Sequence, residues 1–136
     1  MVITGIAMPD AVVEAADSSW EKVVEKSPRP SIVMFYSPTC PYCRTIEPYF
    51  REYSNEYRDL VTFVRLNVAA STWTAERYAV RATPTFKFFC QGRPIAEMVG
   101  AVYPALLKKM IDDSLAHGAE CVQNSTVIDY DISGYA

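Results

Sequence analysis

Two cysteines stand three residues apart where an apolar run passes into a helical pattern. The run, Ser31 to Tyr36, is typical of a strand covered on both faces, and the cysteines are Cys40 and Cys43. Helix positions i and i+3 share one face with Cβ atoms about 5–6 Å apart, near the separation that a disulfide tolerates. A helix N-terminus favours negative charge. We therefore expect a stabilised thiolate at Cys40, and the thiolate is the nucleophile of disulfide exchange.

The bulk properties narrow the class of protein. The 136 residues suffice for one domain with a buried core, and a net charge of −3 argues against a broad nucleic-acid interface. No apolar run reaches the roughly 18 residues of a membrane span. The first ten residues contain no Lys or Arg and make a poor signal peptide. We expect a cytoplasmic monomer without nucleic-acid or membrane partners, in which a close cysteine pair serves redox catalysis or binds metal.

The hydrophobic periodicity predicts alternating strands and helices in the order β-α-β-α-β-α-β-β-α. Such alternation predicts a largely parallel sheet with helices on both faces, closed by an antiparallel hairpin. The predicted elements are a short strand at Val12–Val13, a helix from a capping box at Ser18–Glu21 to Lys26, a strand at 31–36, a helix at 40–57, a strand at 61–67, a helix at 71–78, a hairpin of strands 85–90 and 95–99, and a helix from Pro104 to about 117.

These elements define one domain over residues 11–117, with an N-terminal extension at 1–10 and a C-terminal tail at 118–136. We expect the tail to be disordered, as termini often are. A weak strand pattern is nevertheless present in it, with Ile128, Tyr130 and Ile132 alternating with acidic residues.

Several motifs occur together in a fixed order. They are FYSPTCPYC at the strand-to-helix turn, Pro48 inside the following helix, Arg81-Ala82-Thr83-Pro84-Thr85, the hairpin from Phe89 to Gly92, and Val99-Gly100-Ala101. With this set the chain resembles the thioredoxin family from about Val12 to Ala116. The resemblance implies the α/β thioredoxin fold, a central mixed sheet with a parallel β-α-β-α-β part, an antiparallel C-terminal hairpin and helices on both faces.

The resemblance also implies roles for individual residues. Cys40 would attack a substrate disulfide to form a mixed disulfide, and Cys43, more buried, would resolve it. Thr83-Pro84 resembles the family's cis-proline, beside which an extended substrate segment binds through the backbone. The implied substrate-binding positions are Pro41, Tyr42, Thr83, Pro84 and Gly100. Partners would be disulfide-containing proteins and a thioredoxin reductase or similar electron donor, with no bound cofactor and no metal.

The chain departs from the usual thioredoxin pattern around the cysteines. Pro41-Tyr42 is the pair typical of glutaredoxins and predicts a somewhat more oxidising couple. Thr39 replaces the usual Trp, Met34 stands where the family has a buried acid, and Arg65 stands where it has a lysine. Arg65 is a candidate for tuning a cysteine pKa or is simply solvated. Without the acid, removal of the Cys43 proton would need water or another group.

A protein-disulfide reductase is the function that these features favour. A disulfide oxidase or isomerase fits the same chemistry, and a thioredoxin-fold binding module, with or without zinc at the cysteine pair, is the alternative of another class. A glutathione-dependent glutaredoxin is disfavoured because Val99-Gly100-Ala101 replaces the Gly-Gly segment of that family. Outside the pair, we expect Cys90 to be a buried small apolar residue, Cys121 to be exposed in the tail, and His117 to favour a helix C-terminus.

Overall fold

The structure is a computed structural model and describes residues 10–117 and 128–129. Its elements alternate as the periodicity predicts, apart from a π-helical turn, η1, and a short last strand. In chain order they are β1 (Val12–Ala15), η1 (Glu21–Glu25), β2 (Ser31–Tyr36), α1 (Pro41–Glu56), β3 (Thr62–Asn67), α2 (Thr72–Arg77), β4 (Thr85–Cys90), β5 (Arg93–Val99), α3 (Pro104–Ala116) and β6 (Ile128–Asp129).

The strands form one mixed sheet in the order β1-β3-β2-β4-β5-β6. β1, β3 and β2 run parallel, β4 is antiparallel to β2, and β5 is antiparallel to β4. This is the predicted thioredoxin arrangement, which the structure confirms. β6 pairs in parallel with β5, so the weak strand pattern of the tail does form a strand at Ile128–Asp129, where we expected disorder. The rest of that pattern, Tyr130 and Ile132, lies outside the described residues, as do residues 1–9, 118–127 and Cys121.

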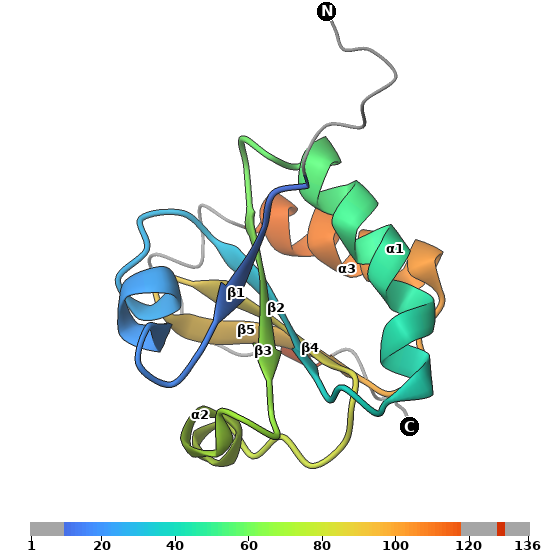
Figure 1. The fold of residues 1–136 in the computed structure, drawn as a ribbon. Helices are drawn as coiled ribbons and strands as arrows, with labels where there is room; N and C mark the ends of the chain where they lie inside the picture. The colour runs from blue at the N-terminus through green and yellow to red at the C-terminus, as the bar shows by residue number, and fades with distance from the viewer. Residues whose placement is uncertain (1–9, 118–127, 130–136) are drawn as a thin grey trace, which may run out of the picture.

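Helices cover both faces of the sheet. Figure 1 shows α1 and α3 together on one face, with η1 and α2 on the other. The two central strands are therefore enclosed, and every residue of β2 and β4 is buried. Burial on both faces explains the nearly continuous apolar run of β2 in place of an alternating pattern, while β4 is mostly apolar and includes the buried Lys87.

The face beneath α1 and α3 holds the larger part of the core. Phe50 of α1 packs between Phe63 of β3 and Phe86 of β4, with ring centroids 5.0 and 6.0 Å away. Ile46, Phe50, Tyr53 and Tyr57 all point inward, as their helical spacing predicts. Cys40 and Cys43 belong to the same apolar cluster, so the cysteine pair is built on the core of the domain.

The opposite face is organised around Trp20. Its ring contacts Phe35, Tyr78 and Phe89, and its Nε1 donates a hydrogen bond to the Tyr78 hydroxyl at 3.1 Å. The predicted capping box was wrong, because Trp20 is the N-cap of η1 and makes no side-chain cap bond. A helix this short gains little from its own hydrogen bonds, so burial of Trp20 decides its geometry.

Candidate active site

The first cysteine begins α1. Cys40 is the N-cap residue, with extended backbone (φ −87°, ψ 112°), and Pro41 follows in the first turn. The Cys40 Sγ accepts a hydrogen bond from the backbone N–H of Cys43 at 3.1 Å. Proline suits this turn because its fixed φ is helical and it lacks the N–H that would be unpaired there. The predicted placement of Cys40 at a helix N-terminus is confirmed.

The surroundings of Cys40 favour its thiolate. Burial alone raises the pKa of a thiol, but hydrogen bonds with the Cys43 and Thr83 side chains and the N–H groups of Cys43 and Tyr42 outweigh it, so the pKa of Cys40 lies below its ordinary value. As a thiol, Cys40 lies 3.4 Å from the backbone oxygen of Thr83, to which it donates. Cys40 is thus more acidic than an ordinary cysteine thiol.

The second cysteine is held in the opposite state. Cys43 is 3% exposed against 7% for Cys40, and both are free thiols. Burial, followed by the hydrogen bond and charge interaction with Cys40, raises the pKa of Cys43 to about 11. The pair is therefore asymmetric, with one thiol that ionises readily and one that stays protonated at neutral pH.

The predicted substrate-binding residues lie around this pair. The Thr83–Pro84 peptide bond is cis, as the resemblance implied. The Gly100 N–H donates to the Pro84 carbonyl at 2.8 Å, which joins the end of β5 to the loop that touches Cys40. Pro41 and Tyr42 are exposed at the start of α1. The structure brings all five predicted positions to the cysteines, and their roles in binding stay predictions.

Beneath the cysteines the sheet offers no acid from β2. Met34 is fully buried and is the register partner of Arg65 on β3. The Arg65 guanidinium forms ion pairs with Glu14 at 2.7 Å and Glu47 at 2.6 Å, and it lies over the Tyr36 ring. Arg65 is not among the main causes of either cysteine pKa shift. Its proposed tuning role is untested, and its contacts are with these neighbours.

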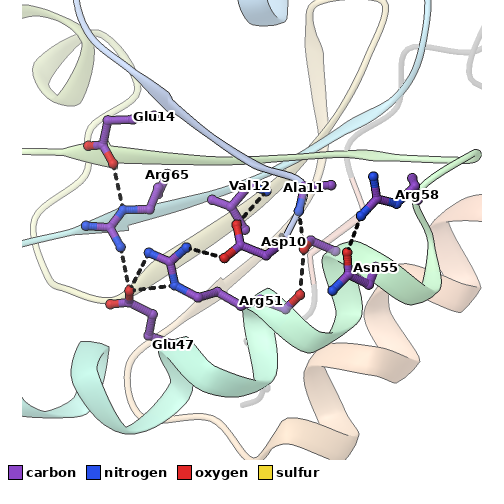
Figure 2. A network of polar contacts seen from close by, with 10 residues as sticks. Asp10, Ala11, Val12, Glu14, Glu47, Arg51, Asn55, Arg58 and Arg65 are labelled. Atoms are coloured by element: carbon purple, nitrogen blue, oxygen red, sulfur yellow. Dashed lines mark hydrogen bonds and ion pairs between the residues drawn. The ribbon is translucent and has the colours of Figure 1, made fainter. Parts of the chain in front are cut away.

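Glu47 is the residue that the sequence analysis missed. Its Oε2 accepts hydrogen bonds from Arg65 and from two nitrogens of Arg51, and Arg51 also bonds Asp10 at 2.8 Å (Figure 2). The only sequence signal was the spacing of Glu47 one helical turn after Cys43 and one turn before Arg51. The contact with Arg65 joins residues 18 apart and needs the folded sheet.

The other residues singled out in the sequence lie apart from this chemistry. Cys90 is buried at the end of β4, as predicted, but it is disulfide-bonded, whereas we expected it to serve only as a small apolar residue. His117 is the C-cap of α3. Among the described residues, no group of three His, Cys, Asp or Glu side chains is placed to hold a metal ion. No helix of the described part of the chain is both long and apolar enough to cross a membrane.

A cis-proline beside a reactive cysteine, at the start of a helix on a mixed sheet, defines a dithiol site of the thioredoxin type. The family model for thioredoxin matches residues 11–113. The chain belongs to the thioredoxin family, as its motifs predicted. Membership supports a thiol–disulfide oxidoreductase in general terms.

Curated relatives agree with this assignment. The chain is 35% identical over 112 residues to a chloroplastic thioredoxin M-type of Brassica napus, and the aligned part covers 82% of this chain and 60% of that protein. It is 34% identical over 108 residues to a thioredoxin of Acidithiobacillus ferridurans, covering 79% of this chain and 100% of that protein. A thioredoxin M-type of Pisum sativum is 36% identical over 96 residues, covering 71% and 56%. The matches thus span little more than half of these plant relatives.

Proposed function

We propose that this protein reduces protein disulfides through a dithiol–disulfide cycle of Cys40 and Cys43. The observation that carries the proposal is the asymmetry of the pair, because the pKa of Cys40 is lowered while that of Cys43 is raised to about 11. The Cys40 thiolate attacks one sulfur of a substrate disulfide, and the other sulfur leaves as a thiolate. Cys43 then attacks Cys40 and releases the second substrate thiolate, so two electrons pass to the substrate.

The residues near Cys40 suit an extended substrate segment. The backbone of Thr83 lies beside the Cys40 sulfur, and Gly100 has no atom within 4 Å of the position that a Cβ would take. An extended peptide binds such a backbone edge much as a strand joins a sheet. Pro41 and Tyr42 are exposed beside it, and they complete the proposed substrate-binding surface together with Pro84.

The cycle needs a reductant and no bound cofactor. We propose a thioredoxin reductase or a similar dithiol donor, a monomeric protein and a cytoplasmic setting. The disulfide at Cys90 is a feature more common in oxidising compartments. Subcellular fractionation with an antibody tests the compartment, and recovery in an oxidising compartment would overturn that part of the proposal.

Turnover with insulin tests the reductase function. With dithiothreitol as reductant, the protein should accelerate the precipitation of insulin B chains, and Cys40→Ser should remove the acceleration. The exposed Thr45→Ser variant, one turn along α1, is the matched control and should stay active. An absence of acceleration, or acceleration that survives Cys40→Ser, would contradict the proposal.

A disulfide oxidase or isomerase is the second candidate, favoured by Pro41-Tyr42 between the cysteines and by Met34 in place of an acid. The reduction potential of the Cys40–Cys43 couple in a glutathione buffer separates the two directions. A reductase should lie near the roughly −270 mV of thioredoxin, and a value closer to the roughly −180 mV of protein disulfide isomerase would favour the second candidate.

A binding module is the candidate of another class. Such a protein would hold its partners equally well after Cys40→Ser and would show no insulin turnover. Metal analysis of the purified protein tests its zinc-containing version.

A further inference from the structure

The resolving step must remove a proton from a thiol that the core encloses. Cys43 is 3% exposed, and Met34 on β2 is fully buried in the same apolar cluster. At neutral pH only a small part of a thiol with a high pKa is ionised, so the attack of Cys43 needs a proton acceptor within reach. Neither residue offers one.

Glu47 is the carboxylate placed closest to Cys43 along α1. Residues four apart in a helix lie on the same face, with Cβ atoms about 5–6 Å apart. Glu47 does not extend into solvent, because its Oε2 lies 2.6 Å from Nη1 of Arg65 on the neighbouring sheet, and its side chain is 27% exposed. The carboxylate therefore contacts the sheet from α1, the helix that also carries Cys43.

The register of the sheet fixes where that carboxylate lies. Glu14, Arg65 and Met34 are partners on the adjacent strands β1, β3 and β2. Their side chains share the face under α1, where partners in parallel strands point the same way. Glu47 is thus bonded to Arg65, the register partner of Met34. A carboxylate from α1 therefore reaches the β3 residue that neighbours Met34 in the sheet, while β2 itself contributes no acid there.

The charged groups around Glu47 hold it in place. Arg51 contacts it from α1 and is shared with Asp10, and Arg65 contacts it from β3 and is shared with Glu14. From β2, the Tyr36 hydroxyl donates to Glu14 at 2.6 Å and does not compete for Glu47. All three guanidinium contacts are made by Oε2. Oε1 receives none of these three bonds and has lone pairs for a proton.

We propose that Glu47 is the proton acceptor for Cys43 in the resolving step, which deepens the function proposed above and rests on it. The Cys43 S–H proton passes to the Glu47 carboxylate, directly or through one water, while the Cys43 sulfur bonds to the Cys40 sulfur. The bond between Cys40 and the substrate sulfur breaks, and the substrate leaves as a thiolate. Glu47 then returns its proton to that thiolate or to solvent, so the carboxylate is regenerated.

Dithiobis(nitrobenzoate) separates the two chemical steps in one trace. Attack by Cys40 releases one coloured thionitrobenzoate, and attack by Cys43 on the resulting mixed disulfide releases the second. Glu47→Gln keeps the size and the acceptor oxygen but removes the basic carboxylate. The first phase should keep its rate and the second should slow about tenfold or more at pH 7. The difference should shrink at high pH, because hydroxide then deprotonates Cys43.

Glu14→Gln is the matched control, since Glu14 is the other carboxylate on Arg65 but lies on β1. Its second phase should stay within about twofold of the wild type, whereas a slowing equal to that of Glu47→Gln would show that the position of Arg65 matters and would overturn the proposal. An unchanged second phase in Glu47→Gln would overturn it as well.

The wild-type protein supplies a readout that needs no variant. With an internal acceptor, the second phase should not respond to the concentration of an imidazole buffer at constant pH and ionic strength. A rate that rises in proportion to the buffer base would show that the proton leaves through solvent, against the proposal. Insulin turnover is a separate measurement. If the protein does not reduce insulin but its second phase still depends on Glu47, the reductase function is rejected and the role of Glu47 stands.

Discussion

The Cys40 sulfur accepts a hydrogen bond from the backbone N–H of Cys43, 3.1 Å away across the first turn of α1. This bond stabilises negative charge on Cys40, and the same charge, together with burial, makes ionisation of Cys43 harder. The order of reaction of the two thiols therefore follows from the burial of Cys43 together with this bond in the first turn of α1.

Alkylation should reproduce that order. We expect iodoacetamide at pH 7.5 to label Cys40 well before Cys43, because only the thiolate reacts. With rising pH, labelling of Cys40 should reach half of its maximum below pH 9.0, the ordinary thiol value, and Cys43 should become reactive only toward about pH 11. Peptide mass spectrometry after timed quenching measures both rates. Equal labelling of Cys40 and Cys43 in the folded protein would contradict the asymmetry. The control is urea-unfolded protein, in which both cysteines should be labelled at the same rate.

Removal of the second thiol should trap the intermediate. Cys43→Ser leaves the Cys40 nucleophile but cannot break the bond between Cys40 and the substrate. The substrate is an insulin fragment whose single cysteine is activated as a disulfide with a small aromatic thiol. Its mixed disulfide with Cys40 should then accumulate and appear as a shifted band on a non-reducing gel. Cys40→Ser is the matched variant and should give no such band. A trapped adduct of similar yield in Cys40→Ser would mean that Cys43 is the attacking thiol.

Two glycines with positive φ should differ in their tolerance of alanine. Gly100 has φ +96° and open space around an added Cβ, so Gly100→Ala should cost only the backbone strain, about 1–2 kcal/mol of unfolding free energy. Gly92 has φ +79°, and its added Cβ would lie 2.6 Å from the Glu25 backbone oxygen. Gly92→Ala should cost roughly 1–3 kcal/mol more, because the backbone of η1 must move. Urea unfolding of both variants measures the difference. Equal losses of unfolding free energy would show that the Gly92 turn and the Glu25 backbone move apart without cost.

The N-terminus of α2 should depend on Asp17, a residue far away in sequence. Its Oδ1 accepts from the Thr74 N–H at 2.9 Å and the Thr74 hydroxyl at 2.6 Å. The hydrogen bond from the Thr74 side chain is the largest cause that lowers the pKa of Asp17, with the backbone N–H groups adding to it. Since the folded pKa is below the unfolded value, the stabilisation is complete above about pH 4 and is lost as the pH falls through the folded value.

Thermal unfolding of Asp17→Ala at pH 7 and near pH 3 tests this sign. The variant should melt below the wild type at pH 7, and the gap should narrow at the lower pH. Asp59→Ala removes an exposed carboxylate from a turn and is the control, which should show little change at pH 7. A gap that widens on acidification would contradict the assigned role.

Much of the fold could be predicted from local pattern. A continuous apolar run marked β2, aromatic and β-branched residues marked β4, and the spacing of Ile46 and Phe50 marked the inward face of α1. The thiolate position of Cys40 followed from its place before a helix. These predictions succeeded because the signals depend on neighbours in the chain, through helical periodicity, strand burial and the exposed N–H groups of a helix start.

The predictions failed or fell short where distant residues meet. The capping box at Ser18 was wrong, because Trp20 is the N-cap of η1 and its ring packs against Phe35 and Phe89 of distant strands. Asp17 as the cap of α2 and Glu47 as the partner of Arg65 were not predicted at all. These contacts need the strand order and register, which no local signal specifies.

For the cysteine pair, the sequence by itself determined the two thiols, their spacing and the helix start that favours charge on Cys40, because these depend on residues within one turn. Only the tertiary structure decided the depth at which Cys43 is buried, the meeting of Cys40 with Thr83 and the ion pair between Glu47 of α1 and Arg65, the register partner of Met34. Burial and long-range electrostatics arise when separate strands and helices pack together, and they are therefore properties of the folded chain.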